Sequence, residues 1–173
     1  MKKYLIISLL LLPALLGAQE LPKDVLRNLE AYNVVYNHMA RNGSADSMPL
    51  GNGDITVNAW VEESRDLMLY IGKQDSWSEA GRLLKVGRVR LRLDPNPFTE
   101  DTRFTQTLNL PDGCIDIRAV SAVGDVTVKL WVDANAPVIR MDVKADRKMS
   151  LFVSNDGMRE QKVFMDRKVF ERG

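Results

Sequence analysis

The chain has 173 residues, with 24 basic and 23 acidic side chains, one histidine and one cysteine. This near balance of charge argues against a nucleic-acid partner, which would need a clustered basic field. The single cysteine, Cys114, excludes an internal disulfide. With His38 as the single histidine, the sequence offers almost nothing from which to build a serine triad or a histidine-rich metal site. We therefore predict no metal site and no cofactor.

The first segment, MKKYLIISLLLLPALLGAQE, has the three parts of a secretory signal peptide. Lys2 and Lys3 form a positively charged N-terminal region, residues 4–16 are apolar, and Gly17-Ala18 supplies the small residues of a cleavage site. The apolar run is shorter than the roughly 20 residues that a membrane span needs. We expect cleavage after Ala18, which leaves 22 basic residues against 23 acidic ones. The mature protein is then secreted or periplasmic, with no membrane contact.

After the signal peptide, the segment PKDVLRNLEAY, residues 22–32, predicts one short helix. From residue 32 onward, apolar and polar residues alternate with a period of two, which is typical of strands with one buried face. In VGRVRLRL, for example, Val89 and the leucines alternate with three arginines. The predicted strands cover residues 55–61, 67–71, 86–93, 104–110, 114–120, 125–132 and 138–144.

The segments DPNPF, LPDG, AVGD and DANAP separate these strands and are rich in turn residues. Strands at such short spacing, with almost no helical stretch between them, predict an all-β antiparallel sandwich. We expect residues 19–173 to form this single domain. Residues 155–157, Asn-Asp-Gly, are typical of a turn, and the polar segment after them contains no clear final strand. The domain is therefore expected to be incomplete at its C-terminus.

The stretch SMPLGNGDI contains Gly51-Asn52-Gly53, which resembles the start of a phosphate-binding loop. The third glycine of a dinucleotide fingerprint would fall on Thr56, and a strand follows instead of the helix N-terminus that a pyrophosphate needs. We therefore predict a tight turn, with a positive φ at one or both glycines.

Adjacent carboxylates occur at Glu62-Glu63 and at Glu100-Asp101, both in predicted turns. A glycosidase needs two carboxyl groups that face each other across the scissile bond, at about 5–10 Å. Neighbouring turn residues do not meet that requirement, so we interpret these pairs as solvated charge and predict no catalytic residue. Cys114, at the start of a strand, is interpreted as a structural thiol.

Two tryptophans interrupt polar strand faces. Strict alternation places Trp60 and Trp131 on the faces opposite Val57 and Val128, which predicts the valines in the core and the indoles on the reverse sides. Aromatic side chains beside polar groups are typical of contact surfaces, including platforms that stack on sugar rings. The alternative is that another sheet or a loop covers them.

The third tryptophan, Trp77, lies in the polar segment KQDSWSEAGR, close to Lys73 and Asp75. Sugar binding needs a flat apolar face with planar polar groups beside it, and this segment supplies both. A role as a loop anchor is the alternative interpretation.

Three blocks of the chain carry a family resemblance: SMPLGNGDITVNAWVE, LYIGKQDSWSEAGRLLKVGRVRLRLDPNPF and LWVDANAPVIRM. They resemble the N-terminal region of the family called domain of unknown function 5703, over residues 32–141. More distantly, PLGNGD followed by a strand and a Trp-Ser loop is similar to the opening of glycoside hydrolase family 95, which contains α-L-fucosidases and related galactosidases.

The resemblance implies an N-terminal β-supersandwich that precedes a helical (α/α)₆ barrel in a secreted carbohydrate-active protein. The catalytic carboxylates of such enzymes lie in the barrel, so none is carried over, and no turnover is expected from this chain alone. Asn52 and Asp54 are then expected near a sugar site. The expected partners are an oligosaccharide or polysaccharide and the barrel domain. The alternatives are a freestanding carbohydrate-binding sandwich and a structural domain of the cell envelope.

Overall fold

The computed structural model describes residues 21–157, so the predicted signal peptide and the segment after Gly157 lie outside the described residues. The helices are α1 (Lys23–Glu30) and the 3₁₀ turn η1 (Gly43–Asp46). The strands are β1 (Val34–Tyr36), β2 (Met48–Gly51), β3 (Ile55–Val61), β4 (Leu67–Trp77), β5 (Leu83–Asp94), β6 (Arg103–Asn109), β7 (Cys114–Ser121), β8 (Gly124–Val132), β9 (Ile139–Ala145) and β10 (Ser150–Asp156).

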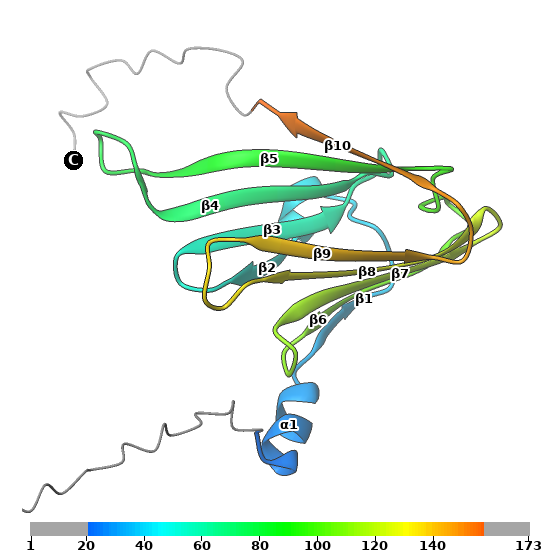
Figure 1. Ribbon diagram of the computed structural model, residues 1–173, viewed down its shortest axis with the longest axis horizontal. Coiled ribbons are helices and arrows are strands. Elements are labelled where there is room, and N and C mark those ends of the chain that lie inside the picture. The colour runs from blue at the N-terminus through cyan, green and yellow to red at the C-terminus, as the bar shows by residue number, and fades with distance from the viewer. Residues whose placement is uncertain (1–20, 158–173) are drawn as a thin grey trace, which may run out of the picture.

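These strands form two five-stranded antiparallel sheets that pack face to face (Figure 1). Sheet A has the order β1-β6-β7-β8-β9, and sheet B has the order β10-β5-β4-β3-β2. Within the described part of the chain α1 buries no residue, and it projects from the sandwich beside β1 and β6 (Figure 1). The predicted all-β antiparallel sandwich with one short N-terminal helix is confirmed.

The core lies between the two sheets and follows from the alternation in the sequence. Val57 and Val128 are both buried in it, as predicted, while Trp60 and Trp131 lie on the reverse faces of their strands. Each large apolar side chain that is fully buried in this way contributes about 1.5–3 kcal/mol. The main core consists of Met48, Val57, Ala59, Val61, Leu67, Leu69, Leu91, Leu93, Phe98, Phe104, Ile115, Ile117, Ala119, Val126, Val128 and Leu130.

One polar side chain crosses this core. Gln106 of β6 is buried, and its Nε2 donates a hydrogen bond of 3.0 Å to the backbone carbonyl of Ala59 in β3. A buried amide without a partner would destabilise the fold, so this bond favours one lateral alignment of the two sheets.

The sequence patterns did not reveal β1, β2 and β10. The predicted turn at residues 155–157 is wrong in part, because Asn155 and Asp156 extend β10 and pair with Val89 and Arg88 of β5. The physical reason is electrostatic. The Asp156 carboxylate lies 2.9 Å from Arg90 Nε and 3.5 Å from Arg88 Nε, so the arginines of β5 hold the end of β10 in the sheet.

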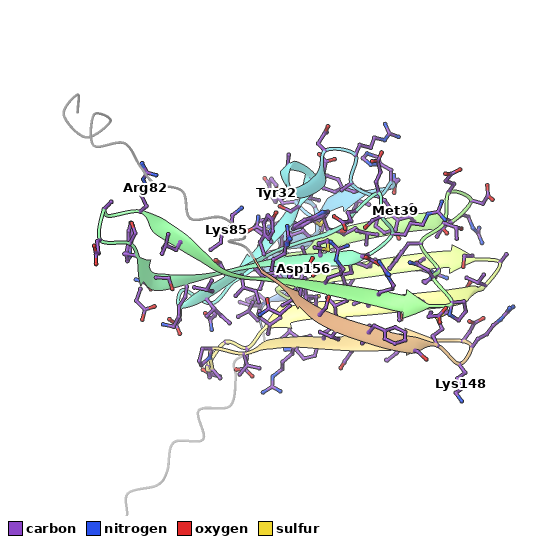
Figure 2. The ribbon with its side chains drawn as sticks, turned by 90° about the horizontal axis from the view of Figure 1, so that it is seen from above. Tyr32, Met39, Arg82, Lys85, Lys148 and Asp156 are labelled. Carbon is purple, nitrogen blue, oxygen red and sulfur yellow. The ribbon has the colours of Figure 1, made fainter. Side chains whose placement is uncertain are left out.

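The sandwich has two distinct ends. The pairing of β3 with β4 ends at Ile55, which lies opposite Lys73. The part of the β4–β5 hairpin beyond Lys73 therefore projects past the end of β3. Figure 2 shows Arg82 at the tip of this hairpin and Lys148 at the opposite end of the molecule. We call the end that carries the hairpin and the β2–β3, β6–β7 and β8–β9 connections the loop end.

Candidate functional site at the loop end

The loop end brings together segments that are far apart in the sequence. The β2–β3 turn turns sharply at Gly53, whose φ of +92° is a left-handed conformation that favours glycine. This confirms the predicted tight turn, with the positive φ at one of its two glycines. Strand β3, and not a helix, follows the turn directly, so the turn does not offer the helix N-terminus that a phosphate-binding loop needs.

Asn52 is the residue that joins this turn to the other sheet. Its Nδ2 donates to the backbone carbonyls of Asp133 and Ala136, at 2.8 and 3.1 Å. Its Oδ1 accepts hydrogen bonds from the backbone N–H groups of Asp54 and Ile55, both at 3.0 Å. The side chain therefore ties the GNGD turn to the DANAP connection across the sandwich, and all of its strong hydrogen-bonding atoms are engaged.

Asp54, Lys73 and Asp75 form a second group at this end. Lys73 Nζ lies 3.0 Å from Asp54 Oδ1 and 2.8 Å from Asp75 Oδ2. The hydrogen bond from Lys73 lowers the pKa of Asp75, and the bonds to Asp75 and then Asp54 raise the pKa of Lys73. All three side chains are substantially exposed to solvent, so these ion pairs contribute little to stability.

Trp131 lies beside an open cleft of about 490 Å³ at the same end. The cleft is lined by Gly51, Asn52, Asp112, Gly113, Trp131, Val132, Asp133 and Ala134. Two cations flank it, because Lys129 Nζ is 2.9 Å from Asp112 Oδ2 and Arg140 Nε is 2.8 Å from Asp133 Oδ2. The backbone N–H of Asn135, followed by Arg140, lowers the pKa of Asp133. The cleft thus combines an indole with two carboxylates, each of which is paired with a cation.

Cys114 is the cross-strand neighbour of Trp131 and is fully buried. Burial, with a further contribution from the nearby Asp116 carboxylate, raises the pKa of the thiol to about 11. A thiol with this pKa is protonated at neutral pH and is a poor nucleophile, which agrees with the predicted structural role.

The other two predicted tryptophans are not part of this cleft. Trp77 lies on the projecting hairpin with 58% of its surface exposed, and its Nε1 donates to the Gln74 carbonyl at 2.7 Å. Trp60 is buried in a small cluster with Ala40 and Met68 on the outer face of sheet B. The backbone N–H of Ala40 donates to the Val61 carbonyl, so the segment before β2 covers this indole. The Trp60 indole is therefore not available to stack on a sugar ring.

Sequence reasoning missed a buried ionic group on the outer face of sheet B. The Asp66 side chain is 0% exposed and accepts hydrogen bonds from Arg90 Nη1 at 2.7 Å and from Arg92 Nε and Nη2 at 2.9 and 2.8 Å. Arg90 also binds Glu62 at 2.6 Å and Asp156 at 2.9 Å. We call Glu62, Asp66, Arg90, Arg92 and Asp156 the Asp66 cluster.

The Asp66 cluster corrects the interpretation of Glu62 as solvated turn charge, because its partner Arg90 lies on the neighbouring sheet surface. Hydrogen bonds from Arg92 and then Arg90 hold the pKa of Asp66 below its ordinary value despite burial. The bond to Asp66 raises the pKa of Arg90. The sequence signal was the arginine at every second position of VGRVRLRL, because acidic side chains on neighbouring segments pair favourably with such a row.

The comparison with family models decides the family. The model described as a domain of unknown function (DUF5703), for the N-terminal domain, matches residues 35–172. The chain belongs to the DUF5703 N-terminal domain family. No curated protein sequence matches the chain.

In this DUF5703 domain, the three blocks that carried the resemblance meet at the loop end. Asn52 binds the DANAP block through Asp133, and Asp54 binds the second block through the Lys73 side chain and the backbone N–H of Gln74. Six of the seven predicted site residues, Asn52, Asp54, Lys73, Asp75, Trp77 and Trp131, therefore lie at this end, with Trp77 on the projecting hairpin.

Two further properties of the DUF5703 domain bear on its chemistry. Within residues 21–157, no three His, Cys, Asp or Glu side chains are grouped as ligands of a metal ion. None of the helices in that same range has the length and apolar character needed to cross a membrane.

Proposed function

We propose that this DUF5703 domain is the non-catalytic β-sandwich of a secreted carbohydrate-active protein, and that it binds a saccharide in the cleft beside Trp131. The observation that carries the proposal is the combination of one partly exposed indole with flanking carboxylates and their cation partners. An indole face packs on the apolar C–H face of a sugar ring, while carboxylates and guanidinium groups exchange hydrogen bonds with its hydroxyls.

The ion pairs of the cleft support binding more than catalysis. A glycosidase needs one carboxylic acid that keeps its proton near neutral pH, which requires a raised pKa. The pKa of Asp133 is lowered instead, and Asp112 is paired with Lys129. These groups are therefore suited to accept hydrogen bonds from hydroxyl groups and not to donate a proton to a leaving group.

The wider setting of the proposal comes from the sequence. The signal-peptide pattern of residues 1–18 supports secretion, and the similarity of the PLGNGD block to glycoside hydrolase family 95 supports a carbohydrate-active context. In that setting the sandwich packs against a helical barrel domain that carries the catalytic carboxylates. The loop end then contributes saccharide contacts and no bond cleavage.

The proposal is tested with the secreted chain on a glycan array, followed by calorimetric titration of the saccharides that bind. An aromatic anchor contributes about 2 kcal/mol, so Trp131→Ala is expected to weaken binding roughly thirty-fold, and Trp131→Phe to retain most of it. Trp77→Ala is the matched control, because it removes the same side chain from an exposed position outside the cleft. It should leave the affinity unchanged.

Three results would contradict the proposal or a part of it. If the chain binds none of the arrayed saccharides, the loop end has a structural role instead. If Trp77→Ala abolishes binding while Trp131→Ala retains it, the saccharide lies on the hairpin and not in the cleft. Hydrolysis of an aryl fucoside or galactoside by this chain, lost when one of its carboxylates is substituted, would contradict the non-catalytic part of the proposal.

A further inference from the structure

The outer face of sheet A carries a hollow of about 440 Å³ that lies beside the Trp131 cleft and across β6, β7, β8 and β9. Two of its lining residues, Ile117 and Val128, have their side chains in the core. The other lining residues alternate with core residues along their strands, so their side chains face outward. All of these are polar or charged: Thr105, Thr107, Asp116, Arg118, Thr127, Lys129, Asp142 and Lys144. We call this set the sheet A hollow.

Two cations of the sheet A hollow are placed to bind one ligand group together. Arg118 in β7 and Lys144 in β9 are the cross-strand neighbours of Thr127, one on each side. Neighbouring strands lie about 4.8 Å apart, so the Cα atoms of the two cations are about 10 Å apart and both long side chains can reach over Thr127. Both residues are exposed, and within residues 21–157 neither side chain forms a hydrogen bond or an ion pair. An anionic group between them would therefore meet two cations without breaking an existing contact.

The carboxylates of the hollow leave this pair of cations unneutralised. Asp116 accepts a hydrogen bond of 3.0 Å from Asn109 Nδ2. Asp142 lies in the row of Lys129, whose own Nζ binds Asp112 outside the hollow at 2.9 Å. Within the described part of the chain, neither carboxylate of the hollow forms an ion pair with either of the two cations. The side chains of the hollow therefore favour an anionic group over a cationic one.

The sheet A hollow adjoins the Trp131 cleft along β8. Trp131, Lys129 and Thr127 occupy alternate positions of this strand, and Lys129 is bound to Asp112, which lines the cleft. Strand residues rise about 3.3 Å each, so the path from Trp131 to Thr127 is about 13 Å long. A ligand that covers this path is longer than one sugar ring.

We infer that the ligand is an acidic oligosaccharide, with one ring on Trp131 and a carboxylate or sulfate group between Arg118 and Lys144. The inference rests on the proposed binding of a saccharide in the cleft. A guanidinium group donates two parallel hydrogen bonds to a carboxylate or sulfate, and an ammonium group adds a second charge. The three threonine hydroxyl groups of the hollow both donate and accept hydrogen bonds, as contacts with sugar hydroxyls require.

The lining of the hollow distinguishes this ligand from two other classes of partner. A nucleic acid needs a larger basic field than one pair of cations, and the charge of the chain is nearly balanced. The core of a contact with another protein is depleted of charged residues and enriched in aromatic ones. The side chains that face the hollow are polar or charged, so they suit a hydrated ligand that carries hydroxyl groups.

Calorimetric titration of the full chain with matched acidic and neutral saccharides tests the inference. An array of neutral, uronate-containing and sulfated oligosaccharides first identifies the acidic oligosaccharide that binds most tightly. Its carboxyl-reduced or desulfated form keeps every linkage but loses the charge, and should bind about tenfold more weakly. Added salt should weaken binding of the acidic form and leave binding of the neutral form unchanged.

The two cations are tested with the double substitution Arg118→Gln/Lys144→Gln. This variant should bind the acidic oligosaccharide about tenfold more weakly and its neutral form with unchanged affinity. Arg41→Gln/Lys148→Gln is the matched control, because it removes the same two charges from exposed positions outside the hollow. It should leave both affinities unchanged.

The outcomes separate this inference from the proposed function. Binding of neutral saccharides only, lost in Trp131→Ala, would overturn the inference and leave the proposed function in place. Equal affinities for the acidic and neutral forms, or equal losses in the two double variants, would overturn the inference in the same way. Acidic binding that needs the two cations but not Trp131 would contradict the path that joins them. If no arrayed saccharide binds, the inference and the proposed function both fail.

Discussion

The loop end and the Asp66 cluster both combine carboxylates with cations, yet they differ in their exposure to water. In the Asp66 cluster the central carboxylate is fully buried and accepts three charge-assisted hydrogen bonds from two arginines of β5. At the loop end Lys73 bridges Asp54 and Asp75 in a setting where all three side chains contact solvent. The same chemistry therefore has different consequences in the two regions.

The difference indicates which region stabilises the fold and which is available for recognition. A buried carboxylate that loses its water must keep its cationic partners, so the Asp66 cluster holds β4, β5 and β10 in register. Exposed ion pairs contribute little and exchange readily with water or a ligand. The ion pairs beside the Trp131 cleft are more exposed than Asp66, as the proposed saccharide binding requires.

The largest expected effect is that of Asp66→Ala. The substitution leaves Arg90 and Arg92 facing each other without their shared carboxylate and should lower the free energy of unfolding by about 3 kcal/mol. Asp75→Ala is the matched control at the exposed pair and should not change stability measurably. Urea denaturation of both variants makes the comparison. Equal losses of stability in the two variants would remove the distinction between the regions.

A smaller effect is expected at the loop end from Asn52→Ala, because Asn52 joins the β2–β3 turn to the β8–β9 connection. The substitution removes four hydrogen bonds at a partly buried position and should cost about 2 kcal/mol. Asn58→Ala is a suitable control, since Asn58 makes one side-chain bond to Ser47 on the exposed surface. The account is contradicted if the control destabilises the domain as much as Asn52→Ala does.

A pH titration should reveal a part of the Asp66 effect. The pKa of Asp66 is lowered in the folded protein, so its contribution is complete above the unfolded pKa of about 3.9 and is lost as the pH falls through the lower folded value. The difference in unfolding free energy between the unsubstituted chain and Asp66→Asn should therefore be constant from pH 6 to pH 5 and narrow below about pH 4. A difference that narrows as the pH rises would contradict this sign.

Much of the fold was predictable because a period of two assigns each side chain to a face. The burial of Val57 and Val128 followed directly from that pattern. Strands β1 and β2 were not predicted because they have only three and four residues, too few for an alternation to stand out. The end of β10 was predicted to be a turn because Asn155 and Asp156 favour turns locally, whereas in the structure both residues pair with β5 and its arginines bind Asp156.

The candidate site was predictable in part, for a related reason. Alternation assigned Trp60 and Trp131 to outer faces, but it carries no information on what covers an outer face. The segment around Ala40 buries Trp60, whereas Trp131 borders an open cleft. The role of Asn52 depends on carbonyl groups 81 and 84 residues away, and a contact of that range has no local sequence signal.

The most direct test of the central claim uses the three tryptophans of the chain as separate reporters. In the ¹⁵N-labelled chain, the indole N–H signals of Trp60, Trp77 and Trp131 can be assigned by single Trp→Phe substitutions. Titration with a saccharide that the chain binds should shift the Trp131 signal and leave the buried Trp60 signal in place. A shift of the Trp77 signal with no change at Trp131 would contradict the account.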